Sequence, residues 1–157
     1  KSLESITIRN HVKNIDGSAF SGCKSLKSIT IPNSVKSIGD EAFRDCNDLT
    51  SVTLSNSVTS IGRETFKHCW GLTSITIPDS VKSIGDEAFR GCYDLTSVTI
   101  SDSVTSIGHK AFKRCKSLTS ITFQGSIAQW EEIILHEDWN SEVLAKVVHC
   151  TDGDVEI

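Results

Sequence analysis

Hydrophobic positions recur along this chain at a fixed step of 23 residues. Six leucines keep the step, and five phenylalanines and five cysteines keep it too: Leu3, Leu26, Leu49, Leu72, Leu95 and Leu118; Phe20, Phe43, Phe66, Phe89 and Phe112; Cys23, Cys46, Cys69, Cys92 and Cys115. A constant period between roughly 20 and 50 residues is typical of solenoids, in which each copy forms one coil and stacks on the next. The pattern therefore predicts a stack of coils.

The copy at residues 72–94, LTSITIPDSVKSIGDEAFRGCYD, shows the pattern of one coil. Apolar and polar residues alternate over its first part, and this alternation of β-branched residues predicts a short strand. Pro78 has no N–H to give to a ladder, so the strand should end before it. Eight side chains are expected to point inward: Leu72, Ile75, Ile77, Val81, Ile84, Ala88, Phe89 and Cys92.

The second half of each copy predicts a return path with a corner and a tight turn. A glycine recurs at Gly39, Gly62, Gly85 and Gly108, and a glycine repeated at one corner indicates a positive φ or a tight bend. The segment DEAFRGC that follows is too short for a stable helix. We expect it to form a single helical or 3₁₀ turn.

Charged positions also fall into columns: Glu41, Glu64 and Glu87, and three residues later Arg44, Lys67 and Arg90, with Lys113 in the same basic column. This spacing suits an ion pair across one turn, worth about 0.2–0.5 kcal/mol. The sequence favours a solvated charged edge. A stripe that binds polyanions is the alternative, and the interleaved glutamates argue against it.

The period breaks after Phe123, and the remaining residues predict different elements. Ser126 and Gln129 form a capping-box pattern, which predicts a helix over residues 126–135. Its apolar face would comprise Ile127, Trp130, Ile133 and Ile134. A loop over 136–143, a strand in LAKVVHC (144–150), a tight turn at Asp152-Gly153 and a return strand should follow.

This break divides the chain into two predicted parts. Residues 1–125 are expected to form the solenoid, with five full repeats and the strand of a sixth. Residues 126–157 are expected to form a C-terminal cap made of a helix and a hairpin. In that cap, Trp130 and Trp139 would cover the last coil, an interpretation that we favour over a ligand pocket.

The first copy is the least regular, with Arg9-Asn10-His11 where other copies have Pro or Ser followed by Asn or Asp and then Ser. Nothing polar caps it, so its strand edge and apolar interior would be exposed. We interpret the chain as a piece of a longer protein whose preceding sequence covers this end. Self-association through the uncapped N-terminal coil is a further possibility.

The composition of the chain limits the kinds of partner that it is expected to bind. The net charge is −4 and the pI is about 5.7, which argues against nucleic acid as a partner. No apolar run approaches the roughly 18 residues of a membrane span, so we expect no membrane insertion within this chain. The repeat itself dictates five of the six cysteines, and these are expected to be buried, reduced thiols. Cys150 lies outside the repeat and is the cysteine to test for pairing.

The repeat LTSITIPDSVKSIGDEAFRGC resembles the BspA-like class of leucine-rich repeats over residues 3–123. The resemblance rests on the L-x-S-[IV]-T-[ILF] strand, the S-V-x-S-I-G step and the A-F-x-x-C turn, with Thr65 replacing the Ala in the third copy. It implies a β-rich (α+β) solenoid, a right-handed coil with short parallel strands on its concave face. It also implies bacterial, sometimes protist, proteins that are secreted or displayed on the cell surface and adhere to host proteins, matrix or other cells.

Two groups of residues are candidate binding sites. The strand face would expose two rows of hydroxyls, and its central members are Ser51, Thr53, Ser74, Thr76, Ser97 and Thr99. These residue types also simply suit an exposed strand. Trp70 and Tyr93 occupy one position in adjacent copies and are a possible aromatic contact. No histidine or cysteine spacing matches a metal site and no catalytic motif is present, so we expect no metal and no cofactor.

The sequence therefore favours a non-enzymatic module that binds a protein or glycan ligand at a cell surface through its concave strand face. The alternative is a structural spacer, a stalk segment of a larger surface protein with no ligand of its own. A hydrolase with its site in the cap ranks third, because it would need clustered titratable groups near Trp139.

Overall fold

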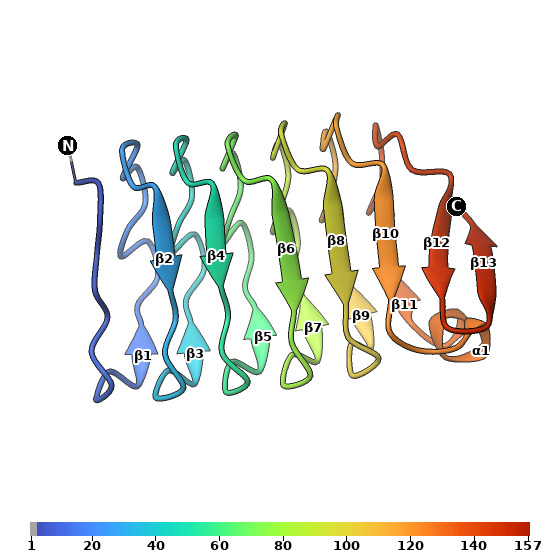
Figure 1. Cartoon of the computed structure of the whole chain (residues 1–157), viewed down its shortest axis with the longest axis horizontal. Helices are drawn as coiled ribbons and strands as arrows, with labels where there is room; N and C mark the ends of the chain where they lie inside the picture. Colours follow the sequence, from blue (N-terminus) through green and yellow to red (C-terminus); the bar gives the residue numbers. More distant parts are fainter. Residues whose placement is uncertain (1–2) are drawn as a thin grey trace.

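The computed structural model describes residues 3–157, which wind into a stack of parallel coils (Figure 1). One side of the stack, the strand face, carries β2 (Ser28–Thr30), β4 (Ser51–Thr53), β6 (Ser74–Ile77), β8 (Ser97–Ile100), β10 (Ser120–Phe123) and β12 (Val147–Cys150). Pairing is parallel between identical repeat positions, as in Ser74 with Ser97. The predicted solenoid with parallel strands is confirmed, and β6 ends directly before Pro78.

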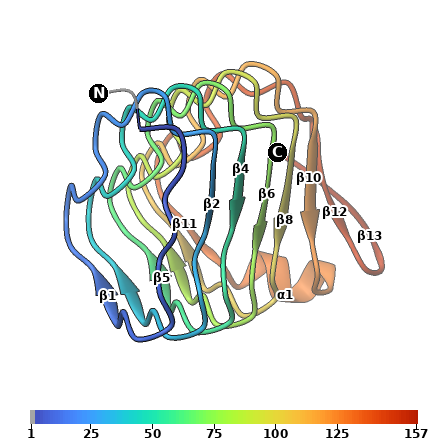
Figure 2. The same cartoon turned by 60° about the vertical axis from the view of Figure 1, so that its left-hand side comes forward.

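A second series of strands, called the return sheet although it is divided into a pair and a four-stranded sheet, was not predicted from the sequence. It comprises β1 (Asn14–Ile15), β3 (Ser37–Ile38), β5 (Ser60–Ile61), β7 (Ser83–Ile84), β9 (Ser106–Ile107) and β11 (Ile134–Leu135). Figure 2 shows these strands on a different side of the stack from β2, β4 and β6. Each is two residues long, too short to leave a visible alternation in the sequence.

The turn side is the segment that follows the return sheet in each coil. A helical or 3₁₀ turn was predicted there, and this prediction was wrong. In the fourth coil the chain makes successive β-turns, closed by bonds such as Arg90 N–H to Glu87 O at 3.1 Å. Glu87 has φ 55° and Gly91 has φ 73°, so left-handed residues recur in the segment. This conformation turns other N–H groups toward the next coil, where Phe89 N–H donates to Ala111 O at 2.8 Å. A helical turn would direct those groups along its own axis.

The recurring corner glycines do not have a positive φ, which corrects that alternative of the prediction. Gly39, Gly85 and Gly108 are required by close approach of neighbouring backbones, whereas a Cβ on Gly62 would lie 2.6 Å from the side chain of Asp40. A Cβ on Gly85 would lie 2.7 Å from the carbonyl carbon of Gly62 and 2.9 Å from Arg63 N. Hence the glycine column lets consecutive coils touch, backbone to backbone, at this corner.

The core is a set of columns that run through the stack. All eight side chains predicted to point inward from residues 72–94 are buried. Phenylalanines stack from coil to coil, with ring centroids 5.4 Å apart between Phe66 and Phe89 and 5.2 Å apart between Phe89 and Phe112. Such stacks add to the burial of each ring.

The five repeat cysteines are buried and free, as predicted, and Cys150 is free and half-buried. Each of the four later repeat thiols donates to a phenylalanine carbonyl of an earlier coil, for example Cys92 Sγ to Phe66 O at 3.2 Å. Burial raises the pKa of the Cys46 and Cys115 thiols to about 12. These thiols are therefore structural groups and are inert at neutral pH.

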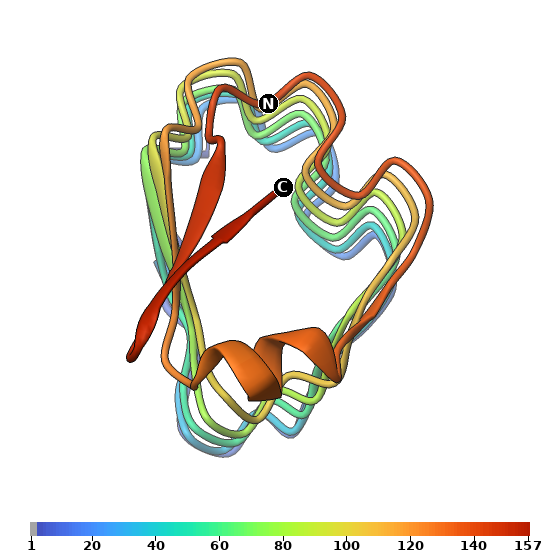
Figure 3. The same cartoon turned by 90° about the vertical axis from the view of Figure 1, so that its right-hand side faces the viewer.

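The last residues extend the stack, and Figure 3 shows α1 and β13 lying across its C-terminal end. The capping box at Ser126 is confirmed, but α1 (Ile127–Glu131) is shorter than predicted. The chain instead forms β11, which pairs with β9 and leaves Ile134 62% exposed. The predicted hairpin is present, with β13 (Gly153–Glu156) antiparallel to β12.

Trp130 and Trp139 are both buried at this end, with ring centroids 5.7 Å apart. Trp139 meets the ring of Phe112 edge-on at 6.4 Å, so it continues the phenylalanine column. The division of the chain at residue 125 and the capping role stay predictions. Residues 1–2, at the start of the predicted solenoid, lie outside the described residues. In residues 3–157 no helix has the length and apolar character that a membrane span requires.

Candidate binding surface

The strand face presents the hydroxyls that the sequence singled out. Ser51, Thr53, Ser74 and Thr76 are exposed on β4 and β6, while Ser97 and Thr99 on β8 are half-buried. None of these six hydroxyls makes a hydrogen bond to another protein group in the described chain. They are therefore held in place by the sheet and are available to water or a ligand.

The hydroxyl rows lie on a strand face that is divided into two sheets. The strand face consists of a pair, β2–β4, and a larger sheet, β6–β8–β10–β12–β13. Between β4 and β6 lies a hollow of about 400 Å³, bordered by Ser51 and Thr53 on one side and Ser74 and Thr76 on the other. Four of the six predicted residues thus surround one concavity, while Ser97 and Thr99 lie beyond it.

The predicted aromatic contact is a stacked pair at the corner that precedes the strands. The rings of Trp70 and Tyr93 lie 6.2 Å apart with an interplanar angle of 28°, and they remain 47% and 38% exposed. Lys116 extends the column, with Nζ 5.9 Å from the centre of the Tyr93 ring. Their role in binding stays a prediction.

The charged columns were expected to form a solvated edge, and the structure corrects this. The pairs within a coil are present, and two of the cations also bridge to the next coil, Arg44 to Glu64 and Lys67 to Glu87, both at 2.7 Å. Arg90 pairs only with Glu87 of its own coil. The side chains of Glu64 and Lys67 are only 9% and 11% exposed. A partly buried ladder of ion pairs therefore joins consecutive coils on the turn side.

The ladder predicts a specific acid dependence of stability. Burial would raise the pKa of Glu87, but hydrogen bonds from Lys67 and Arg90 outweigh burial and lower it to about 2. Because the folded pKa lies below the ordinary value, Glu87 should stabilise the fold above about pH 4.5 and lose that contribution as pH falls toward 2. Chemical denaturation across this range should show the difference between wild type and Glu87→Gln shrinking with acid.

A matched control for this titration is Glu131→Gln, which changes an exposed carboxylate on α1 that makes no ion pair in residues 3–157. Its effect on the free energy of unfolding should be small at every pH. A constant difference between wild type and Glu87→Gln from pH 7 to pH 2 would contradict the role assigned to the ladder.

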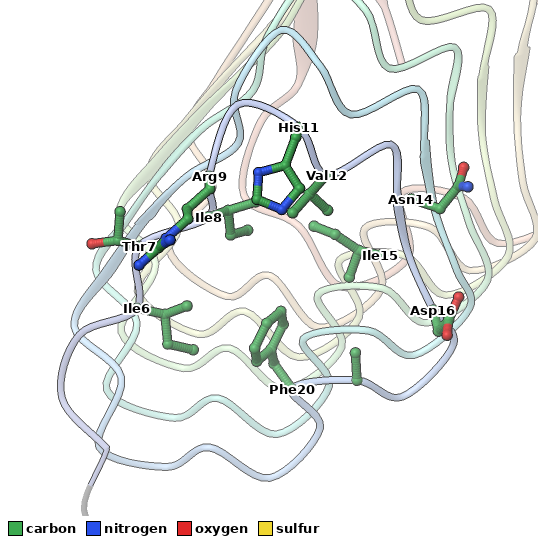
Figure 4. Close-up of a pocket in the computed structure, with 11 residues that line it drawn as sticks. Ile6, Thr7, Ile8, Arg9, His11, Val12, Asn14, Ile15, Asp16 and Phe20 are labelled. Atoms are coloured by element: carbon green, nitrogen blue, oxygen red, sulfur yellow. The ribbon is translucent and has the colours of Figure 1, made fainter.

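The first coil of the described residues has partly exposed apolar side chains. The first coil pairs with β2 only through a bridge between Ser5 and Ser28. A cavity of about 380 Å³ lies there. Figure 4 shows Ile6, Val12 and Phe20 among the residues that line it. These side chains are half-buried, so the apolar interior reaches the surface. Self-association through this end stays a prediction.

The C-terminal end has a smaller hollow of about 360 Å³ beside Trp130 and Trp139. Glu131 and Glu156 are the titratable groups that line it. Across residues 3–157, no group of three or more His, Cys, Asp or Glu side chains is arranged to hold a metal ion.

Stacked coils with in-register strands, a phenylalanine column and an exposed hydroxyl face define a leucine-rich repeat solenoid. The model of the BspA type leucine rich repeat region matches six copies, at residues 1–92 and 59–139. The chain belongs to this family, as its repeat motifs indicated. Members of the family are generally non-enzymatic, and their repeats generally serve protein interaction.

Solved structures that resemble the chain include three bacterial leucine-rich repeat proteins. A leucine rich cell surface protein of Faecalibacterium prausnitzii is 37% identical over 85% of the chain, with a TM-score of 0.82. The T. pallidum leucine rich repeat protein is 29% identical over 81% (TM-score 0.69), and a Bacteroides ovatus leucine-rich repeat protein is 34% identical over 71% (TM-score 0.54). The chain spans 35%, 63% and 35% of their respective lengths. No curated protein matches it in sequence.

Proposed function

We propose that this chain is a non-enzymatic binding module that mediates adhesion at a cell surface through its strand face. The observation that carries the proposal is the set of exposed hydroxyls on β4 and β6, which make no hydrogen bonds within the described protein. A rigid sheet holds them at fixed spacing, so little conformational entropy is lost when a partner binds. Solenoids commonly bind partners along such extended faces.

The similar proteins support a location for this protein outside the cell or on its surface. The F. prausnitzii protein is described as a cell surface protein, and its similarity covers most of this chain. The proposed ligand is therefore a protein or glycan of the host or of the extracellular matrix. The net charge of −4 does not favour nucleic acid.

The test is a binding screen of the protein against immobilised matrix proteins and glycans, with Ser74→Glu/Thr76→Arg alongside. Both residues are exposed, so the variant should keep the fold and its melting temperature. Wild type is expected to bind at least one surface saturably. The variant should lose at least about tenfold in affinity, because two larger, charged side chains would have to be desolvated at the contact.

Equal binding by wild type and the variant would place the site elsewhere. If the panel gives no binding at all, the proposal fails in favour of a spacer, in which these coils only hold other domains away from the cell.

A further inference from the structure

Within the described residues, the strand face is interrupted between β4 and β6. The gap between these two strands has the shape of a wedge. At the start of β4 and β6 one hydrogen bond still links the two coils, from Thr73 N–H to Thr50 O, and it is long, at 3.4 Å. The same bond is 2.8 Å one coil earlier, from Thr50 to Lys27, and 2.9 Å one coil later, from Thr96 to Thr73. Beyond this point β4 and β6 do not pair. Figure 1 shows β4 and β6 farther apart than β6 and β8.

The break uncovers apolar side chains that are buried in neighbouring coils. Val52 and Leu54 are half-buried, whereas their counterparts Ile75 and Ile77 in the next coil are 3% and 0% exposed. Both side chains line the hollow of about 400 Å³ between the strands, together with Pro78. The cleft thus has an apolar floor, a rim of hydroxyls and two strand edges that lack their ladder partners.

The cleft continues into a second hollow at the corner below β4. This hollow, of about 850 Å³, shares Thr53 and Leu54 with the cleft and extends to Lys13 and Lys36. Both lysines are exposed, and neither forms an ion pair in residues 3–157. The combined groove is therefore apolar and uncharged at one end and positively charged at the other, on a chain whose net charge is negative.

We propose that this groove binds an extended peptide segment of a partner protein, with an apolar side chain seated between β4 and β6 and an acidic residue beside Lys13 and Lys36. The hydroxyls on the rim of the cleft can form hydrogen bonds with the main chain of an extended peptide that lies across them. The apolar floor binds a side chain, and the two lysines complement a carboxylate. The inference rests on the proposed binding function and names the site and the class of ligand.

The repeats provide matched variants for the test. Ser51→Glu/Thr53→Arg places two charges on the rim of the cleft, and Ser97→Glu/Thr99→Arg places the same charges on β8, in the intact sheet. Lys36→Glu reverses the charge at the far end of the groove. Its control is Lys82→Glu, at the same repeat position but away from the groove.

The probe is a library of random linear peptides displayed on phage, selected on the immobilised wild-type protein. Enriched peptides are then synthesised, and their dissociation constants are measured by fluorescence anisotropy. We expect peptides that combine an apolar residue with an acidic residue. Their affinity should fall at least about tenfold for Ser51→Glu/Thr53→Arg and about fivefold for Lys36→Glu, and it should change less than about twofold for the two controls.

Three results would overturn the inference: no enrichment over a blank support, equal loss in the cleft variant and its β8 control, or binding unaffected by Ser51→Glu/Thr53→Arg. Glycan or matrix binding in the screen without any peptide binding would remove the peptide site and leave the binding module standing. If neither experiment shows binding, both the peptide site and the proposed binding function are wrong. Circular dichroism and melting curves of each variant separate lost binding from lost fold.

Discussion

Replacing Phe89 with alanine should lower the free energy of unfolding by about 3–5 kcal/mol, the range observed for large aromatic-to-alanine changes in cores. Phe89 is fully buried and stacks on Phe66 and Phe112 at once, so its loss opens a cavity within the column. Neighbouring coils cannot close that cavity, because backbone hydrogen bonds on the turn side fix their spacing. Urea denaturation followed by circular dichroism measures the change.

The control is Tyr93→Ala, which removes an aromatic ring from the same coil at the surface. Tyr93 is 38% exposed and contacts Trp70 along one face, so its removal should lower the free energy of unfolding by about 1 kcal/mol or less. Similar values for Phe89→Ala and Tyr93→Ala would mean that the stacked column does not carry the stability of the solenoid.

Adding one methyl group at Gly85 should have the second largest effect, a loss of about 3 kcal/mol, at the upper end for overpacking. The new Cβ would lie 2.7 Å from Gly62 C and 2.9 Å from both Arg63 N and Ile61 O. These are backbone atoms of the preceding coil, and they cannot rotate away as a side chain does. The two coils would have to separate at the point where Gly85 N–H donates to Ile61 O at 2.7 Å.

Gly22→Ala separates crowding from backbone strain. Gly22 has φ 73°, and its Cβ would meet no atom within 4 Å, so alanine adds only the strain of the left-handed conformation. That strain is about 1–2 kcal/mol and is partly offset by the lower entropy of the unfolded chain. A smaller loss at Gly85 than at Gly22 would contradict the assignment of close approach to the corner glycines.

Much of the fold follows from the repeat period, because a column of identical residues has one simple explanation. Phe89 and Cys92 recur every 23 residues, and stacking coils is what brings such residues together. The capping box at Ser126 was equally readable, since it depends only on residues three positions apart. The end of helix α1 could not be predicted in the same way, because Ile134 and Leu135 pair with β9, which is a tertiary contact.

Of the two alternatives for the corner glycines, a positive φ was wrong. Glycine is the usual indicator of positive φ, but Gly85 is there to let the backbones approach, while Glu87 two residues later has φ 55°. The inter-coil hydrogen bonds impose that conformation on a residue type that rarely adopts it. Local sequence does not show such a constraint, and only the stacked structure reveals it.

The sequence predicted which face of the solenoid carries the candidate site, but it did not predict the cleft in that face. Alternation in the strand segments placed Ser74 and Thr76 outward, and both are exposed. The break between β4 and β6 depends on how the third and fourth coils sit against each other. The third copy has Val52, Leu54 and Ser55 where both neighbouring copies have Ile, Ile and Pro, and these differences by themselves indicate no break.

The most direct test of the central claim, that the strand face carries the ligand, compares three proteins on one binding surface. Wild type, Ser74→Glu/Thr76→Arg and Thr59→Arg/Ser60→Glu would be titrated over the matrix protein or glycan that the screen identifies. The third protein carries the same charge changes on exposed residues at the return sheet.

The account predicts that wild type and the return-sheet variant bind with the same dissociation constant, and that the strand-face variant binds at least about tenfold more weakly. Equal affinities for all three proteins, or a loss confined to the return-sheet variant, would contradict it.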